Sequence, residues 1–73
     1  MIQEIETGVV NAFYPLKGFG FIRREKGKDI FFFYDQIEQD DRLLLVGDIV
    51  SFSIQKTPKG LRAFNIKRVS DNF

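Results

Sequence analysis

The strongest constraint on the fold is a glycine-interrupted aromatic segment, Lys17-Gly18-Phe19-Gly20-Phe21-Ile22-Arg23-Arg24. Read as a β-strand, it sends alternate side chains to opposite faces. One face then holds two phenylalanines flanked by two cations: Lys17, Phe19, Phe21 and Arg23. A core strand would not bury cations in register with its aromatic rings. This face instead suits a partner with flat π-faces and negative charge, as in single-stranded nucleic acid.

A second aromatic run, Ile30-Phe31-Phe32-Phe33-Tyr34, follows closely. Its alternation places Phe31 and Phe33 on one face and leaves Phe32 on the other face for a core. The polar segment between the two runs contains Gly27 and predicts a hairpin turn. Antiparallel pairing of the two strands would bring four rings side by side: Phe19, Phe21, Phe31 and Phe33.

An ordinary hydrophobic core is the simpler explanation of so many phenylalanines. The chain has 73 residues and nine Phe. A domain of this size buries only about 60% of the surface that its unfolded chain exposes. Some aromatic surface is therefore expected to stay exposed, and such patches mark binding sites.

Composition argues against an enzyme. The chain has no Cys and no His, which removes disulfides, thiolate metal sites and the commonest general base. The adjacent carboxylates Asp40 and Asp41 suit a solvated loop, and Gly18-x-Gly20 lacks the third glycine of a dinucleotide site. We therefore predict no catalytic residue, no metal and no cofactor. The net charge of +1 means that any phosphate-binding surface must be a local stripe.

The rest of the chain predicts one small all-β domain over residues 1–73. No apolar run approaches the length of a membrane span, and the first residues are acidic. We therefore expect a cytoplasmic monomer that binds neither membranes nor small-molecule substrates. The patterning predicts a short turn of helix or 3₁₀ followed by a loop within 35–41, apolar residues of 42–46 at one end of the domain and a tail at 70–73. The expected strands are 4–13 (bent at Gly8), 17–24, 28–34, 48–56 and 61–69, the last with Leu61, Phe64 and Ile66 facing inward.

These motifs together resemble the bacterial cold-shock domain family. The segments that match, in order, are Gly8-Val9-Val10, Phe13, Lys17 to Ile22, Asp29 to Tyr34, Gly47 to Phe52, Lys59-Gly60, Ala63 and Asn65-Ile66. The match covers about 8–69. RNA-recognition motifs share the Lys17 to Ile22 hexapeptide, but their other aromatic stretch precedes it, whereas here it follows.

The resemblance implies a five-stranded antiparallel OB-type β-barrel that binds single-stranded RNA or DNA as an RNA chaperone with low sequence specificity. The stacking residues that it implies are Phe13, Phe19, Phe21, Phe31, Phe33 and Tyr34. The polar contacts that it implies are Lys17, Asp29 and Lys59. We count as auxiliary candidates Asn11, Tyr14, Arg23, Lys28, Arg42 and Arg62.

Several positions depart from the family. The family usually has a Trp where this chain has Ala12, and a lysine where this chain has Asn11. Phe33 replaces a histidine, and Phe64 stands where a small residue is usual. The 35–46 loop lacks the aromatic that often lies at its tip. These departures predict a shifted base preference, and they keep a second hypothesis open, namely an OB barrel that binds a protein or serves as an accessory module of a longer chain.

Overall fold

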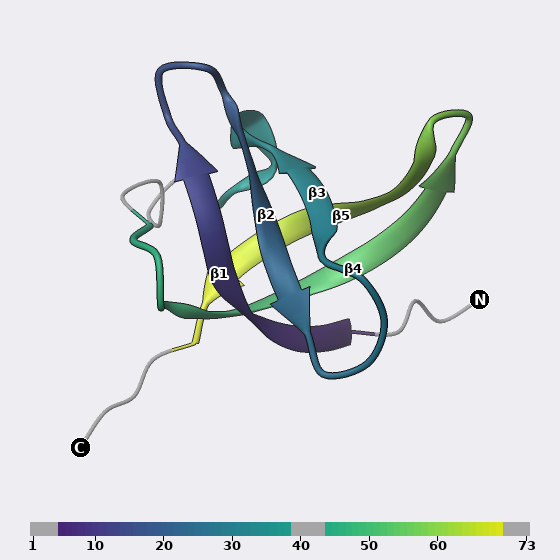
Figure 1. Ribbon diagram of the computed structural model, residues 1–73, viewed down its shortest axis with the longest axis horizontal. Coiled ribbons are helices and arrows are strands. Elements are labelled where there is room, and N and C mark those ends of the chain that lie inside the picture. Colours follow the sequence, from purple (N-terminus) through teal and green to yellow (C-terminus); the bar gives the residue numbers. More distant parts are fainter. Residues whose placement is uncertain (1–4, 39–43, 70–73) are drawn as a thin grey trace.

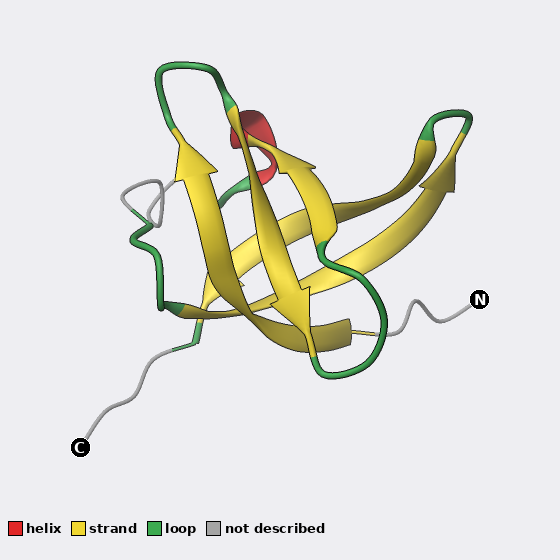
Figure 2. Cartoon of the chain, viewed as in Figure 1, coloured by secondary structure: helices red, strands yellow, loops and turns green. Residues whose placement is uncertain are grey.

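The computed structural model describes residues 5–38 and 44–69. Strands in this part of the chain close into a barrel in the order β1-β2-β3-β5-β4 (Figure 1). A single 3₁₀ turn lies between β3 and β4 in the described residues (Figure 2). The all-β barrel predicted from the sequence is confirmed. The elements are β1 (Ile5–Tyr14), β2 (Phe19–Arg24), β3 (Ile30–Phe33), η1 (Tyr34–Gln36), β4 (Ile49–Thr57) and β5 (Gly60–Arg68).

The barrel departs from the prediction at one seam. The pairings β1–β2, β1–β4, β2–β3 and β4–β5 are antiparallel, as expected. The β3–β5 pairing is parallel, with Phe31 opposite Arg62. The long crossover through η1 and β4 allows this geometry, since a parallel pair cannot be joined by a tight hairpin.

The two aromatic strands are shorter than their sequence pattern predicts. Lys17 and Gly18 lie in the turn before β2, because both backbone N–H groups donate to the Tyr14 carbonyl at 2.9 Å. Gly18 adopts φ 85°, which favours glycine. Lys17 therefore does not share the strand face of Phe19, contrary to the prediction. Tyr34 begins η1 instead of extending β3.

Gly8 marks the point where β1 passes from one partner strand to the other. It lies opposite Arg24 of β2 and opposite Val50 of β4. A β-carbon at Gly8 would lie 2.5 Å from the Arg23 carbonyl oxygen, so only glycine allows this approach. The expected irregularity at Gly8 coincides with the curvature of β1 (Figure 1).

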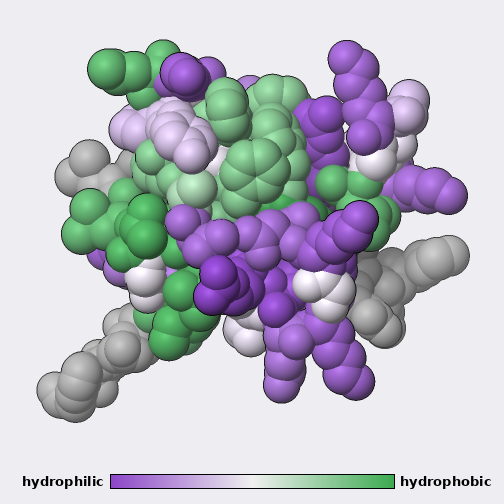
Figure 3. Space-filling view, viewed as in Figure 1, coloured by the Kyte–Doolittle hydropathy of each residue, from purple (hydrophilic) through white to green (hydrophobic). Residues whose placement is uncertain are grey.

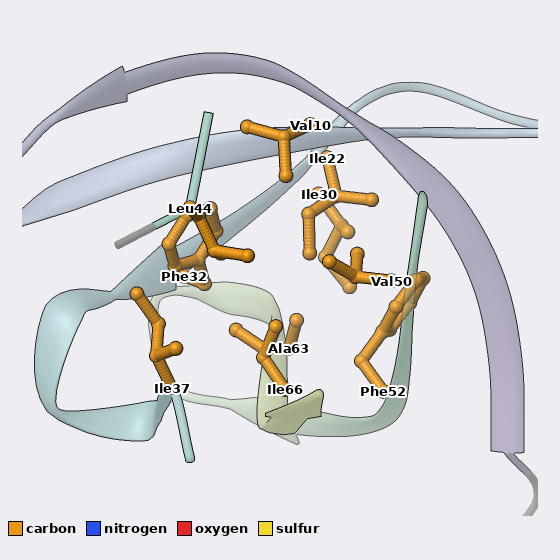
Figure 4. Packing of buried hydrophobic residues seen from close by; sticks show 10 residues of the cluster. All are labelled: Val10, Ile22, Ile30, Phe32, Ile37, Leu44, Val50, Phe52, Ala63 and Ile66. Atoms are coloured by element: carbon orange, nitrogen blue, oxygen red, sulfur yellow. The ribbon is translucent and has the colours of Figure 1, made fainter. Parts of the chain in front are cut away.

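The core forms from the inward-facing residues of all five strands and from the long connection after β3 (Figure 4). The prediction that Phe32 fills the core is confirmed, since its side chain is fully buried. Leu44 is also buried and closes one end as predicted, whereas Leu45 and Val46 are exposed. The buried cluster comprises Val10, Ile22, Ile30, Phe32, Ile37, Leu44, Val50, Phe52, Ala63 and Ile66.

A bulge in β5 changes which residues face the core. Ile66 is buried as predicted, but the other inward position belongs to Ala63, and Leu61 is 47% exposed. Phe64, also predicted to face inward, is only half-buried. The register explains this result, because Phe64 pairs with Ser53 while Lys67 pairs with Ser51. Two β5 residues thus oppose one β4 residue, and Asn65 takes φ 54° to make this possible.

Candidate nucleic-acid interface

The outer side of the barrel carries a continuous group of aromatic rings, which we call the aromatic face: Tyr14, Phe19, Phe21, Phe31 and Phe33. Cross-strand register creates it, because Phe19 pairs with Phe33 and Phe21 with Phe31. Tyr14 extends it onto β1 by pairing with Phe19. Figure 3 shows hydrophobic surface gathered at the upper centre of the molecule, with hydrophilic surface directly below it.

Phe31 occupies the middle of the aromatic face. Its ring centroid lies 5.5 Å from that of Phe19 in a stacked arrangement. The rings of Phe21 and Phe33 meet it edge-on, at 5.6 Å and 4.9 Å. These contacts hold the rings in place, while Phe33 remains 47% exposed. The face is therefore a preformed platform with open ring surface, as base stacking requires.

Gly20 lets the platform lie directly over the core. It lies between Phe19 and Phe21 on the inner side of β2 and is buried. A β-carbon there would lie 2.6 Å from the Ala12 carbonyl oxygen and 2.6 Å from Cζ of Phe32. The absence of a side chain at Gly20 therefore allows β2 to approach both β1 and the Phe32 ring closely.

Cations border the aromatic face. The guanidinium of Arg62 lies over two of its rings, with Cζ 4.4 Å from the Phe31 centroid and 4.8 Å from that of Phe33. On the opposite border, Nζ of Lys17 lies 5.9 Å from the Tyr14 centroid. Lys17 thus reaches the face from the turn rather than from β2. Sequence reasoning gave Arg62 only an auxiliary place, because the parallel β3–β5 pairing that brings it to Phe31 was not foreseen.

A polar network lies beside the Phe21–Phe31 pair. The Asn11 amide nitrogen donates to the Asp29 carboxylate at 2.7 Å, and Arg23 donates to the Asn11 amide oxygen at 3.2 Å. Asn11 therefore joins a carboxylate and a guanidinium at the polar edge of the face. Lys28 follows in the same connection, where its carbonyl accepts a hydrogen bond from the Arg24 side chain at 3.0 Å.

Phe13 and Tyr34 form a further aromatic pair beside the core. Their rings stack on each other with centroids 6.2 Å apart, and both pack against the core. A bulge between Val10 and Ala12 is the cause. The bulge turns Ala12 outward and Phe13 inward. Without it, the alternation that starts at the buried Val10 would place Ala12 inward and Phe13 outward. Of the predicted stacking residues, Phe13 and Tyr34 are therefore the two that pack against the core, and their part in binding stays a prediction.

The remaining candidates are placed as follows. Lys59 lies in the turn between β4 and β5, and with Phe33 and Arg62 it lines a groove. Arg42 falls outside the described residues. Among the residues that the structure places, no group of His, Cys, Asp and Glu could hold a metal ion. No helix there has the length and apolar character to cross a bilayer.

A small closed β-barrel with a cation-bordered aromatic face defines the class of OB-type single-strand binders. The sequence matches the 'Cold-shock' DNA-binding domain over residues 6–69. The chain belongs to this cold-shock family, as its residues predicted, and it has the nucleic-acid-binding function of a cold-shock protein.

Relatives match over most of their length. The retron Se72 cold shock-like protein of Salmonella heidelberg is 43% identical over 89% of this chain and 100% of its own. Cold shock protein CspC of Bacillus subtilis is 38% identical over 88% of this chain and 98% of its own. Among solved structures, drosophila Unr CSD456 superposes with a TM-score of 0.81 at 27% identity. That match covers 96% of this chain but only 29% of the Unr chain.

Proposed function

We propose that the chain binds single-stranded RNA or DNA across the aromatic face, with bases stacked on Phe19, Phe21, Phe31 and Phe33 and phosphates drawn by the bordering cations. The observation that carries the proposal is the preformed set of adjacent rings around Phe31. Phe21 and Phe33 meet the Phe31 ring edge-on, and the Arg62 guanidinium lies over Phe31 and Phe33. Stacking accepts every base, so sequence preference should be weak.

Binding of this kind makes the protein an RNA chaperone without any chemical step. In a duplex the bases are stacked on one another and cannot reach the rings. Binding therefore favours the unpaired state by mass action, as any ligand favours the state that it binds. Asn11, Asp29 and Arg23 supply donors and acceptors beside the Phe21–Phe31 pair, which suits contact with base edges. Action as a cytoplasmic monomer stays a prediction.

Fluorescence anisotropy with labelled oligo-dT, oligo-U and a matched duplex tests the proposal. We expect both single strands to bind and the duplex to bind far more weakly. Phe21→Leu, which removes a π-face but keeps apolar volume, should weaken binding of both strands. Ile49→Ala is the matched control, because Ile49 is an exposed apolar residue on β4 outside the aromatic face. Equal affinity of Phe21→Leu and the parent would refute stacking at this position. Absence of binding to either strand would instead favour a protein partner.

A further inference from the structure

A groove lies beyond the aromatic face, between β3 and the β4–β5 hairpin. Its volume is about 400 Å³, and it is lined by Phe33, Thr57, Lys59, Arg62 and Phe64. Figure 1 shows the hairpin extending away from the barrel on the β3 side. The size falls within the range of small-ligand pockets.

The groove combines two aromatic walls with two cations. Phe33 contributes from the edge of the aromatic face and Phe64 from β5, where the family usually has a small residue. Lys59 and Arg62 supply positive charge, and no lining residue is acidic. An aromatic slot beside paired cations suits a base with its phosphate.

The hairpin that forms the far wall is held by its own hydrogen bonds. The Thr57 hydroxyl donates to the Gly60 carbonyl at 2.8 Å and accepts from the Lys59 backbone N–H at 3.2 Å. Gly60 adopts φ 119°, which closes the turn. The backbone of Lys59 is therefore held in an ordered turn at the edge of the groove.

Arg62 connects the groove to the aromatic face. It contacts the rings of both Phe31 and Phe33, so Phe33 has a guanidinium on one side and the groove beside it. A strand that crosses Phe31 and Phe33 would meet Arg62 next and then Phe64. The path is continuous on the outer surface, because Arg62 and Phe64 share one face of β5, as residues two apart in a strand do.

The geometry points to an additional nucleotide subsite in this groove, in which a base stacks against Phe64 beside Phe33 and Lys59 and Arg62 bind its phosphate. This inference rests on the proposed function and extends it. Phe64 and Arg62 would supply stacking surface that this chain lacks at Ala12, and the bound strand would continue past β3 onto the β4–β5 hairpin.

The test measures how affinity depends on strand length. Oligo-dT of increasing length, over roughly the 4 to 16 nucleotides that OB folds cover, is titrated into the parent, Phe64→Leu and Leu61→Ala. Phe64→Leu keeps an apolar side chain at this position and leaves in place the Phe64 backbone carbonyl, to which the Ser53 hydroxyl donates. Leu61 is the control, because it is an exposed residue of the same strand outside the groove.

We expect Phe64→Leu to leave the shortest strands unaffected and to weaken the longest strands by about fivefold or more. Leu61→Ala should match the parent at every length. Lys59→Gln, compared with Lys67→Gln at the other end of β5, provides a second test that does not alter packing, and only Lys59→Gln should weaken the long strands.

Two results would overturn the subsite, and they differ in meaning. One result is that the parent binds single strands and that Phe64→Leu and Lys59→Gln bind strands of every length as tightly as the parent does. The groove then takes no nucleotide, and the proposed function stands. If the parent binds no strand, both the subsite and the proposed function fail. A melting temperature of Phe64→Leu close to that of the parent confirms that the comparison concerns folded protein.

Discussion

The guanidinium of Arg62 lies 4.4 Å from the centre of the Phe31 ring, across the parallel pairing of β5 with β3. Two residues that are 31 positions apart in the chain thus meet on one outer surface. The contact is a cation–π interaction, which holds the cation where a phosphate would follow a base stacked on the neighbouring rings. It links the aromatic face to the β4–β5 hairpin.

Phe31→Ala should weaken single-strand binding by about 1–3 kcal/mol, the value of one base–aromatic stack. It should also cost some stability, because the ring contacts Phe19, Phe21 and Phe33. That loss should be smaller than for a core residue, since Phe31 is only half-buried. Anisotropy titration and urea unfolding measure the two effects. Unchanged affinity in a folded variant would remove Phe31 from the interface.

Phe32→Ala should have the opposite profile. The side chain is fully buried, and truncating a buried Phe costs about 3–5 kcal/mol. A domain of this size rarely has more stability than that, so the variant should be largely unfolded in thermal melts monitored by circular dichroism. A melting temperature equal to that of the parent would mean that the two faces of β3 have been assigned the wrong way round.

Asn65→Val should destabilise the fold by about 1–3 kcal/mol, because a β-branched residue resists the φ of 54° on which the β5 bulge depends. Asn65→Gly should be nearly neutral, since glycine adopts this conformation freely. Urea unfolding of both variants gives the comparison. Equal stability of the two would show that the positive φ does not matter to the bulge.

Ala12→Trp should tighten binding. Ala12 pairs with Phe21 on the outer side of the barrel, at the position where the cold-shock family usually has a Trp. A new ring there adds one stacking surface, worth about 1–3 kcal/mol. Thr7→Trp is the control, because it adds the same ring at an exposed position opposite Ser51 of β4. A gain of equal size in both variants would indicate nonspecific attraction to the added ring.

Affinity should fall as salt rises. Each phosphate contact contributes about −0.7 to the slope of log affinity against log salt for single strands. Lys17→Gln should make the slope less negative by about that amount, because Lys17 borders the aromatic face near Tyr14. Lys67→Gln should leave it unchanged. A slope near zero in the parent would rule out phosphate contacts and favour the alternative of a protein partner.

The barrel and most of the aromatic face could be predicted because period-two alternation holds along β2 and β3. Two bulges limited the rest. One, between Val10 and Ala12, turns Phe13 toward the core, and the other places Ala63 in the core instead of Phe64. A bulge adds one residue on one strand only, and it reverses the faces of everything beyond it without a clear sequence signal.

Arg62 was predicted only as an auxiliary residue for a different reason. Its position over Phe31 depends on a pairing between strands distant in the sequence, which local patterns do not encode. The positive φ of Asn65 was foreseeable in part, since Asn is one of the few residues that tolerate that region.

The most direct test of the account is an NMR titration that maps backbone amide shifts of the parent with oligo-dT and oligo-U at two salt concentrations. We predict that shifts concentrate in β2, in β3 and in the turn that carries Lys17, and that they weaken at the higher salt. Shifts confined to other strands, or no shifts with either oligomer, would contradict a nucleic-acid interface on the aromatic face.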